Sequence, residues 1–152
     1  MRFQSHPCSC GAAACLNAII ALGGRATEAE LRSLAGTTKE GTSADGIVKA
    51  LRDSGYTAVR RIFAQELDAW EWLQEELLRG KAVIIDVDDG EHWVAAIGFL
   101  GDKVTLADSG RYRKNVQENG VLVLPKLELL ERWRFETEGE IWFQGISVGK
   151  KR

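Results

Sequence analysis

The run from Gly11 to Leu22 constrains the fold more than any other stretch of this sequence, because Asn17 is its one polar side chain. Gly23 and Gly24 follow it, and glycine commonly stands just past the end of a helix. A helix that is apolar on every side has to be buried on every side. We therefore expect a central helix inside the core, around which the rest of the chain is arranged.

Cys10 stands at the start of this expected helix. The unpaired N–H groups and the positive dipole end of a helix favour a thiolate at such a position. Gln4 lies six residues upstream, where its amide could donate to an oxyanion beside the sulfur. The alternative is that Cys10 is a small buried hydrophobic residue, the commonest role of a free cysteine. If this chain is an enzyme, we expect its chemistry here.

A glutamine followed six residues later by Cys-Gly at the start of an alanine-rich helix resembles the papain-like cysteine peptidases. The chain is most similar to the bacteriocin-processing, double-glycine leader peptidases, which usually form the N-terminal domain of peptide-exporting ABC transporters. It departs from their pattern at Ser9, where an acidic residue is frequent, and at Ser109, where proline is frequent. The other matching segments follow in the same order along the chain: Gly41-Thr42-Ser43, Gly46-Ile47, Ala50-Leu51 up to Gly55, His92-Trp93-Val94-Ala95 and Ala107-Asp108-Ser109-Gly110.

The resemblance implies a site as well as a fold. It implies Cys10 as the nucleophile, His92 as the base and Asp108 as the group that orients His92. It also implies an oxyanion hole made by the Gln4 amide and the Cys10 backbone N–H. The implied fold is papain-like, with the nucleophile at the start of the buried central helix and the histidine and aspartate on a mainly antiparallel sheet.

The order of local signals independently favours an α+β domain, because helix signals come first and strand signals afterwards. Thr27 opens a capping box for a short helix to about Ala35, and Ser43 caps the next helix. The segment 65–79 has apolar residues at helical spacing, including Leu67 and Leu78, with Glu76 among the acidic residues of its opposite face. The expected strands are 56–63, with an Arg60-Arg61 pair typical of a sheet edge, 82–87, 92–99, 104–108, 121–124 and 141–148, with a short helix from Pro125 to Trp133.

Size and charge place the chain in a broad class. Its 152 residues fit a single domain, 1–152, and the net charge of −2 with a pI near 5.8 argues against a nucleic-acid partner. The Gly11–Leu22 run is too short to span a bilayer, and its single upstream positive charge argues against a signal peptide. Three cysteines cannot all pair within one chain, which favours a reducing compartment. We expect a cytoplasmic protein without membrane insertion.

Three alternatives concern the carboxylate partner of His92 and the state of the cysteines. Asp86, Asp88, Asp89 and Glu91 could replace Asp108 as the partner of His92, although such acidic stretches usually form solvated turns. A zinc site is the second alternative, but the cysteine spacing lacks the Cys-x2–4-Cys pairs typical of zinc, and we expect no metal and no cofactor. A reversible disulfide of Cys8 with Cys10 or Cys15 also stays open, whereas His6 is expected to be an exposed loop residue.

The hairpin between the two strands around residue 101 gives a geometric test of the site. Residues on antiparallel neighbours share a face only in the correct register. A two-residue turn pairing Leu100 with Lys103 would place His92 and Asp108 on opposite faces. We therefore predict the register that places both side chains on the same face, through either a three-residue loop that pairs Phe99 with Lys103 or a β-bulge.

The resulting hypothesis is a stand-alone cysteine endopeptidase that cleaves a peptide or protein through an acyl-thioester. The resemblance implies small residues, often Gly-Gly, before the cut, and docking to a separate transporter or substrate protein. Two other classes remain: a catalytically inactive relative that only binds peptides, and a papain-like transferase or deamidase. Residue identities cannot separate hydrolysis from transfer, because only the acceptor differs.

Overall fold

The computed structural model describes residues 1–110 and 120–151. The helices α1 (Cys10–Ala21), α2 (Glu28–Ala35) and α3 (Ala44–Asp53) come first, which confirms the predicted α+β order. The later elements are β1 (Tyr56–Phe63), α4 (Glu66–Leu78), β2 (Ala82–Val87), β3 (His92–Leu100), β4 (Lys103–Ala107), β5 (Val121–Pro125), α5 (Lys126–Trp133), β6 (Phe135–Thr137) and β7 (Glu140–Lys150).

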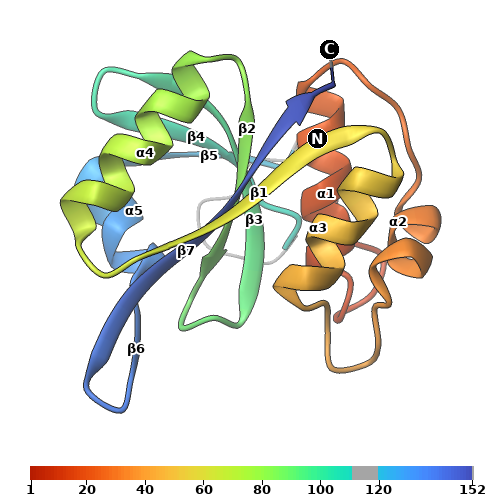
Figure 1. Ribbon diagram of the computed structural model, residues 1–152, viewed down its shortest axis with the longest axis horizontal. Helices are drawn as coiled ribbons and strands as arrows, with labels where there is room; N and C mark the ends of the chain where they lie inside the picture. Colours follow the sequence, from red (N-terminus) through yellow and green to blue (C-terminus); the bar gives the residue numbers. More distant parts are fainter. Residues whose placement is uncertain (111–119, 152) are drawn as a thin grey trace.

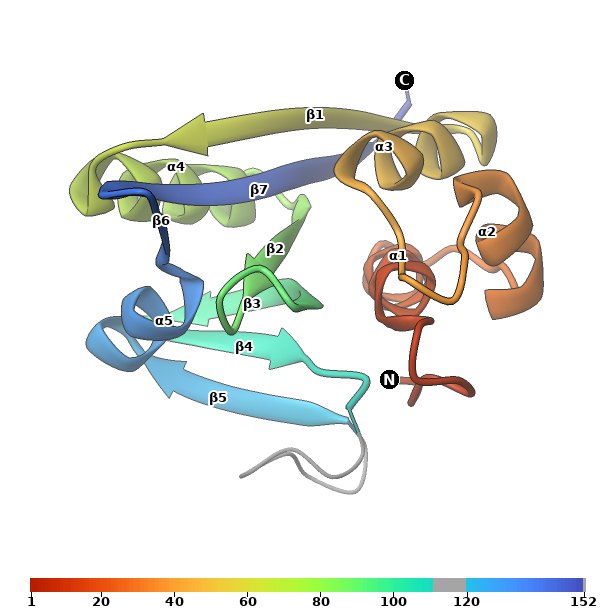
Figure 2. The ribbon, with the colours of Figure 1, turned by 90° about the horizontal axis from the view of Figure 1, so that it is seen from below.

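One strongly bent sheet separates two groups of helices (Figures 1 and 2). Its strand order is β1-β7-β2-β3-β4-β5, with β6 paired to β7, and every described strand pair is antiparallel. The helices α1, α2 and α3 gather on one side of the sheet, whereas α4 and α5 lie on the other side. The strand with the Arg60-Arg61 pair, β1, is an edge strand as predicted.

The two faces of the sheet bury two separate cores. Side chains alternate along a strand, so Ile84 packs toward α1 and α3, whereas Ile85 packs toward α4 and α5. Leu31, Ile47 and Leu51 belong to the first core, and Leu73, Leu129, Trp133 and Phe143 to the second.

The central helix is buried as the sequence predicted. Every residue of α1 from Cys10 to Ile19 is buried. Its buried amide, Asn17, accepts from the Arg2 N–H at 2.8 Å and donates to the Arg2 carbonyl at 3.1 Å. This pair of bonds holds the N-terminal segment against α1. None of the helices that the structure describes is long and apolar enough to cross a membrane.

The loop before α3 ties the start of α1 to the sheet. A Cβ at Gly11 would lie 2.6 Å from the Cβ of Thr42, so only glycine allows this close approach. The Thr42 carbonyl in turn accepts from the indole N–H of Trp93 on β3 at 3.1 Å. The Gly11–Thr42–Trp93 contacts therefore fix α1 against the strand that begins at His92.

The capping predictions are confirmed, but the apolar face predicted for α4 is partly wrong. Thr27 accepts from the Glu30 N–H at 3.2 Å and Ser43 from the Gly46 N–H at 3.0 Å. In α4, however, Leu67 and Leu78 are 58% and 74% exposed, and Glu76 is only 9% exposed. The sheet meets a face of α4 centred on Trp70, Trp72 and Leu73, and the Glu76 carboxylate lies 3.5 Å from Lys81 Nζ.

The hairpin of β3 and β4 has a register that places His92 and Asp108 on the same face of the sheet. Its turn is the two-residue one, because Leu100 pairs with Lys103, so the three-residue loop is wrong. A β-bulge between Ala96 and Gly98 then adds one residue, and Ala96 pairs with Leu106. The bulge confirms the second predicted route, and it returns the start of β3 to the register that brings His92 onto the face of Asp108.

Candidate active site

Cys10 lies at the N-terminus of α1, where the first N–H groups of a helix have no partner within it. Its side chain is 8% exposed and belongs to the first core. Burial raises the pKa of this thiol, but a hydrogen bond to the His92 side chain, the Trp93 backbone and the charge of His92 outweigh burial, so the net pKa is lowered. Cys10 thus has the environment of a reactive thiolate.

The other two cysteines differ from Cys10. Burial raises the pKa of Cys15 to about 12, which keeps this thiol protonated inside α1. Cys8 is half-buried, and all three cysteines are free. No group of three or more histidine, cysteine or carboxylate side chains that could hold a metal ion occurs in residues 1–110 and 120–151.

His92 connects Cys10 to Asp108. The Nε2 atom of His92 lies 2.7 Å from Oδ1 of Asp108, and the two side chains are 3% and 0% exposed. Because Nε2 is bonded to the carboxylate, the remaining ring nitrogen, Nδ1, is left for the Cys10 sulfur. The structure therefore brings the three predicted residues together in the order thiol, imidazole, carboxylate, which is the arrangement of a nucleophile, its base and an orienting group.

Backbone contacts fix the Asp108 carboxylate. Its Oδ1 also accepts from the Gly110 N–H at 2.9 Å, and its own N–H donates to the Gly120 carbonyl at 2.8 Å. Burial raises the pKa of Asp108. The hydrogen bond from His92 and its charge, followed by Gly110 and Arg132, lower the pKa by more than burial raises it, so the net pKa is below the ordinary value.

Gln4 lies beside this group of residues, and its amide is engaged. Its backbone N–H donates to the Ser109 carbonyl at 3.0 Å, and its Oε1 accepts from the Ser109 hydroxyl at 2.8 Å. Its Nε2 donates to the carbonyls of His6 at 2.9 Å and Pro7 at 3.1 Å. The oxyanion role of Gln4 stays a prediction, because donation to a substrate requires one of these two bonds to exchange.

The acidic residues before His92 have other partners. Asp88 forms a two-point ion pair with Arg132, with both contacts at 3.0 Å, so it does not replace Asp108. Asp86 is half-buried, and its Oδ2 accepts from Gln144 at 3.3 Å. Burial raises the pKa of Asp86 to about 6, although Gln144 and the charge of His92 act in the opposite direction. Sequence reasoning missed Arg132 because no local pattern relates α5 to the site.

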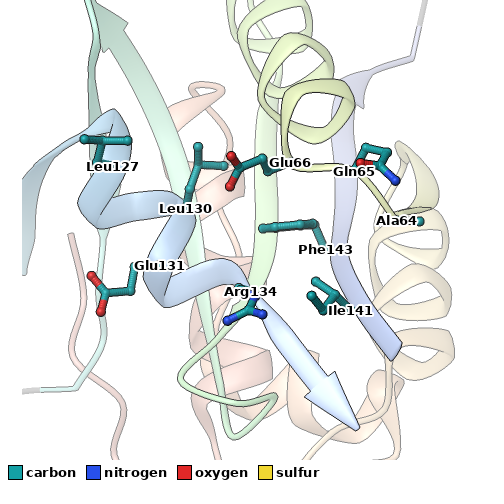
Figure 3. Close-up of a pocket in the computed structure, with 9 residues that line it drawn as sticks. All are labelled: Ala64, Gln65, Glu66, Leu127, Leu130, Glu131, Arg134, Ile141 and Phe143. Atoms are coloured by element: carbon teal, nitrogen blue, oxygen red, sulfur yellow. The ribbon is translucent and has the colours of Figure 1, made fainter. Parts of the chain in front are cut away.

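A separate pocket of about 530 Å³ lies between the start of α4, α5 and the β6–β7 hairpin (Figure 3). In Figure 3, Phe143 and Ile141 lie on the β7 side of the pocket, Leu130 lies on the α5 side, and Glu66 is close to Leu130. None of Cys10, His92 and Asp108 lines this pocket.

The chain matches known proteins over most of its length. The family model described as "Peptidase C39 family" matches residues 1–124. LagD of Lactococcus lactis, the "Lactococcin-G-processing and transport ATP-binding protein", is 31% identical over 132 residues, which are 82% of this chain but only 18% of LagD. An "Uncharacterized protein" of Methanothermobacter thermautotrophicus is 33% identical over 114 residues, covering 75% of this chain and 74% of that protein.

Solved structures share the fold. The peptidase domain of Streptococcus ComA, a bi-functional ABC transporter involved in quorum sensing, superposes with a TM-score of 0.71 at 19% identity, covering 99% of this chain and 97% of that domain. A double glycine motif protease from an AMS/PCAT transporter, in complex with the leader peptide, gives a TM-score of 0.67 at 21% identity, with coverage of 94% and 88%. The papain-like arrangement expected from the sequence is thereby confirmed.

Proposed function

The chain belongs to the peptidase C39 family, and on that premise we propose that it is an active cysteine endopeptidase with Cys10 as its nucleophile. The observation that carries this proposal is the alignment of Cys10, His92 and Asp108, with the pKa of the thiol lowered and Nε2 of His92 2.7 Å from Asp108. An inactive peptide-binding relative needs no such alignment. Residues 1–152 act in this proposal as one peptidase domain, since β7 lies between β1 and β2 in the sheet.

The reaction follows from the positions of these groups. The Cys10 thiolate attacks a peptide carbonyl, forming the S–C bond and a tetrahedral oxyanion that the Cys10 N–H and the released Gln4 amide stabilise. Protonated His92 gives its proton to the leaving amine as the C–N bond breaks. Water, deprotonated by His92, then attacks the acyl-thioester, and the carboxylic acid leaves as the thiol re-forms. Asp108 holds the imidazole in the required orientation throughout.

The similar proteins suggest the substrate. LagD processes lactococcin G by its name, and the AMS/PCAT domain is a double glycine motif protease bound to a leader peptide. The substrate proposed for this chain is accordingly a peptide with small residues such as Gly-Gly before the cut, presented by a transporter or by the substrate protein itself. The cytoplasm is the proposed site of action, because the three free cysteines are typical of a reducing compartment.

A peptide library tests this function. The purified 152-residue chain is incubated with peptides that vary around Gly-Gly, and the products are read by mass. Cleavage that is lost in Cys10→Ala and kept in the control Cys8→Ala supports the peptidase. Deamidation or incorporation of an added amine would replace it with the transferase or deamidase class, and unchanged peptides that still bind would indicate an inactive relative.

A further inference from the structure

Arg132, in the last turn of α5, reaches the far side of the Asp108 carboxylate. Its Nη2 lies 3.5 Å from Oδ2 of Asp108 and 3.0 Å from Oδ2 of Asp88. Its Nε donates to Oδ1 of Asp88 at 3.0 Å. The guanidinium is therefore held by two bonds to Asp88 while one nitrogen faces Asp108. A fork of this kind fixes the plane of an arginine as well as its charge.

The two oxygens of Asp108 have different surroundings. Oδ1 accepts from His92 and from the Gly110 N–H. Oδ2 is buried and accepts no hydrogen bond within the part of the chain that the structure describes. A buried carboxylate oxygen without a hydrogen bond is unfavourable, so the nearby Arg132 charge is what compensates Oδ2. A carboxylate with one oxygen facing a cation and the other facing His92 cannot rotate without losing both contacts.

The residue that holds Arg132, Asp88, belongs to the turn that leads into His92; its two bonds to the guanidinium are called the clamp below. The Asp88 N–H donates to the Arg132 carbonyl at 2.9 Å, so backbone and side chain of Asp88 both bind the end of α5. Asp88, Asp89 and Gly90 all have positive φ, at 56°, 59° and 76°, a tight conformation that puts β3 directly after the clamp. The same turn thus positions His92 on one side of Asp108 and Arg132 on the other.

We propose that Arg132, clamped by Asp88, is a positioning residue that keeps the Asp108 carboxylate aimed at Nε2 of His92. The inference rests on the proposed function, since it concerns the same site. Within residues 1–110 and 120–151, the charged groups that face the His92–Asp108 pair are Arg132 from α5, with Asp88 behind it, and Asp86 from β2, and the Cys10 thiol of α1 bonds His92. Arg132 contacts Asp108, and Asp108 contacts His92, whose side chain bonds the Cys10 thiol. This chain of contacts is the proposed route by which Arg132 acts on the thiol.

Alkylation of Cys10 as a function of pH tests the positioning role without any peptide substrate. Without the cation on Oδ2 the Asp108 carboxylate can turn away from Nε2, and the Cys10 thiolate then loses part of the imidazolium charge that stabilises it. Arg132→Gln should therefore move the acid limb of Cys10 alkylation upward by on the order of one pH unit, which is a roughly tenfold loss of rate on that limb. Asp88→Asn, which keeps the guanidinium but weakens its clamp, should move the limb in the same direction by less. Arg132→Lys, which keeps the charge, should restore part of the shift.

Arg134→Gln is the matched control, because Arg134 lies two residues further along and pairs with Glu136 at 3.1 Å. It should leave the acid limb in place. A lowered melting temperature of the Arg132 and Asp88 variants with an unchanged acid limb would overturn the proposal and leave Arg132 as a tie between α5 and the turn. His92→Ala, measured in parallel, separates the two hypotheses: if it leaves Cys10 alkylation unchanged, the proposed function fails irrespective of Arg132.

Discussion

His92 and Asp108 meet at 2.7 Å although the hairpin that joins them starts in a register that would separate them. The two-residue turn pairs Leu100 with Lys103, and this pairing alone would point the two side chains to opposite faces. The bulge between Ala96 and Gly98 corrects the register before the strand reaches His92. The triad geometry therefore depends on one extra residue in β3, Ile97, as well as on the identity of the residues at its ends.

Replacing Asp108 with asparagine should slow the reaction far more than it weakens substrate binding. The amide oxygen of asparagine can keep a hydrogen bond to Nε2 of His92 but lacks the negative charge that favours the protonated imidazole, so we expect kcat to fall by about tenfold or more. Steady-state kinetics with a cleavable peptide measures this split between kcat and KM. Asp89→Asn is the control, since Asp89 is exposed in the adjacent turn; equal losses in the two variants would argue against an orienting role for Asp108.

Limiting iodoacetamide should label Cys10 before Cys8 and Cys15. Alkylation requires thiolate and access; the pKa of Cys10 is lowered, whereas burial raises the pKa of Cys15 to about 12. As the pH is lowered, labelling of Cys10 should persist below the pH at which a free thiol, with a pKa near 8.5, stops reacting. Peptide mapping after each pH point measures this. His92→Ala should abolish the advantage and His6→Ala should not; preferential labelling of Cys8 would move the nucleophile away from Cys10.

Gln4→Ala should lower kcat with little change in KM. The amide would contact charge that develops only in the transition state, and one such donor contributes about 3 kcal/mol, or on the order of a hundredfold in rate. Ser109→Ala removes the hydroxyl that donates to Oε1 of Gln4 and should have a smaller effect in the same direction. If the Gln4 variant turns over normally, its bonds to the His6 and Pro7 carbonyls are its whole role, and it is a loop residue.

Asp86→Asn should stabilise the protein at neutral pH and not at low pH. The pKa of Asp86 rises from 3.8 to about 6 on folding because of burial, so the folded state binds the proton more tightly and loses stability as the pH rises through this range. If Asp86 were fully buried, this pKa shift would correspond to a loss of about 3 kcal/mol of folding stability at high pH. Because Asp86 is half-buried and partly screened by solvent, we expect a loss on the order of 1 kcal/mol.

Thermal unfolding of Asp86→Asn and wild type at about pH 4 and about pH 8 measures the difference in stability between the two proteins. This difference should vanish at the lower pH. A wild type that is more stable than the variant at the higher pH would contradict the assigned direction. Asp89→Asn again serves as the exposed control.

Local signals predicted much of this fold because they act over a few residues. The all-apolar α1, the caps at Thr27 and Ser43 and the strand 82–87 were all recognisable from sequence. The three-residue strand β6 was missed because it exists only through its pairing with β7. The face of α4 was partly wrong, since the sheet, rather than the helix period, decides that Leu67 is exposed and Glu76 buried.

The site also contains residues that the sequence predicted and one that it did not. Cys10, His92 and Asp108 stand at recognisable starts and ends of elements, and the structure brings them together. Arg132 gave no signal, because its contacts with Asp88 and Asp108 join positions 44 and 24 residues apart and depend on how α5 packs. Contacts of this kind arise only when the tertiary structure forms.

The intact mass of the protein during turnover tests the central claim most directly. When the chain is mixed with a cleavable Gly-Gly peptide and quenched with acid within the first turnover, we predict a species heavier by the acyl portion of the peptide, attached at Cys10. This adduct should disappear as the carboxylic acid product accumulates, and it should be absent in Cys10→Ala. Cleavage that persists in Cys10→Ala, or an adduct on Cys8 alone, would contradict the account.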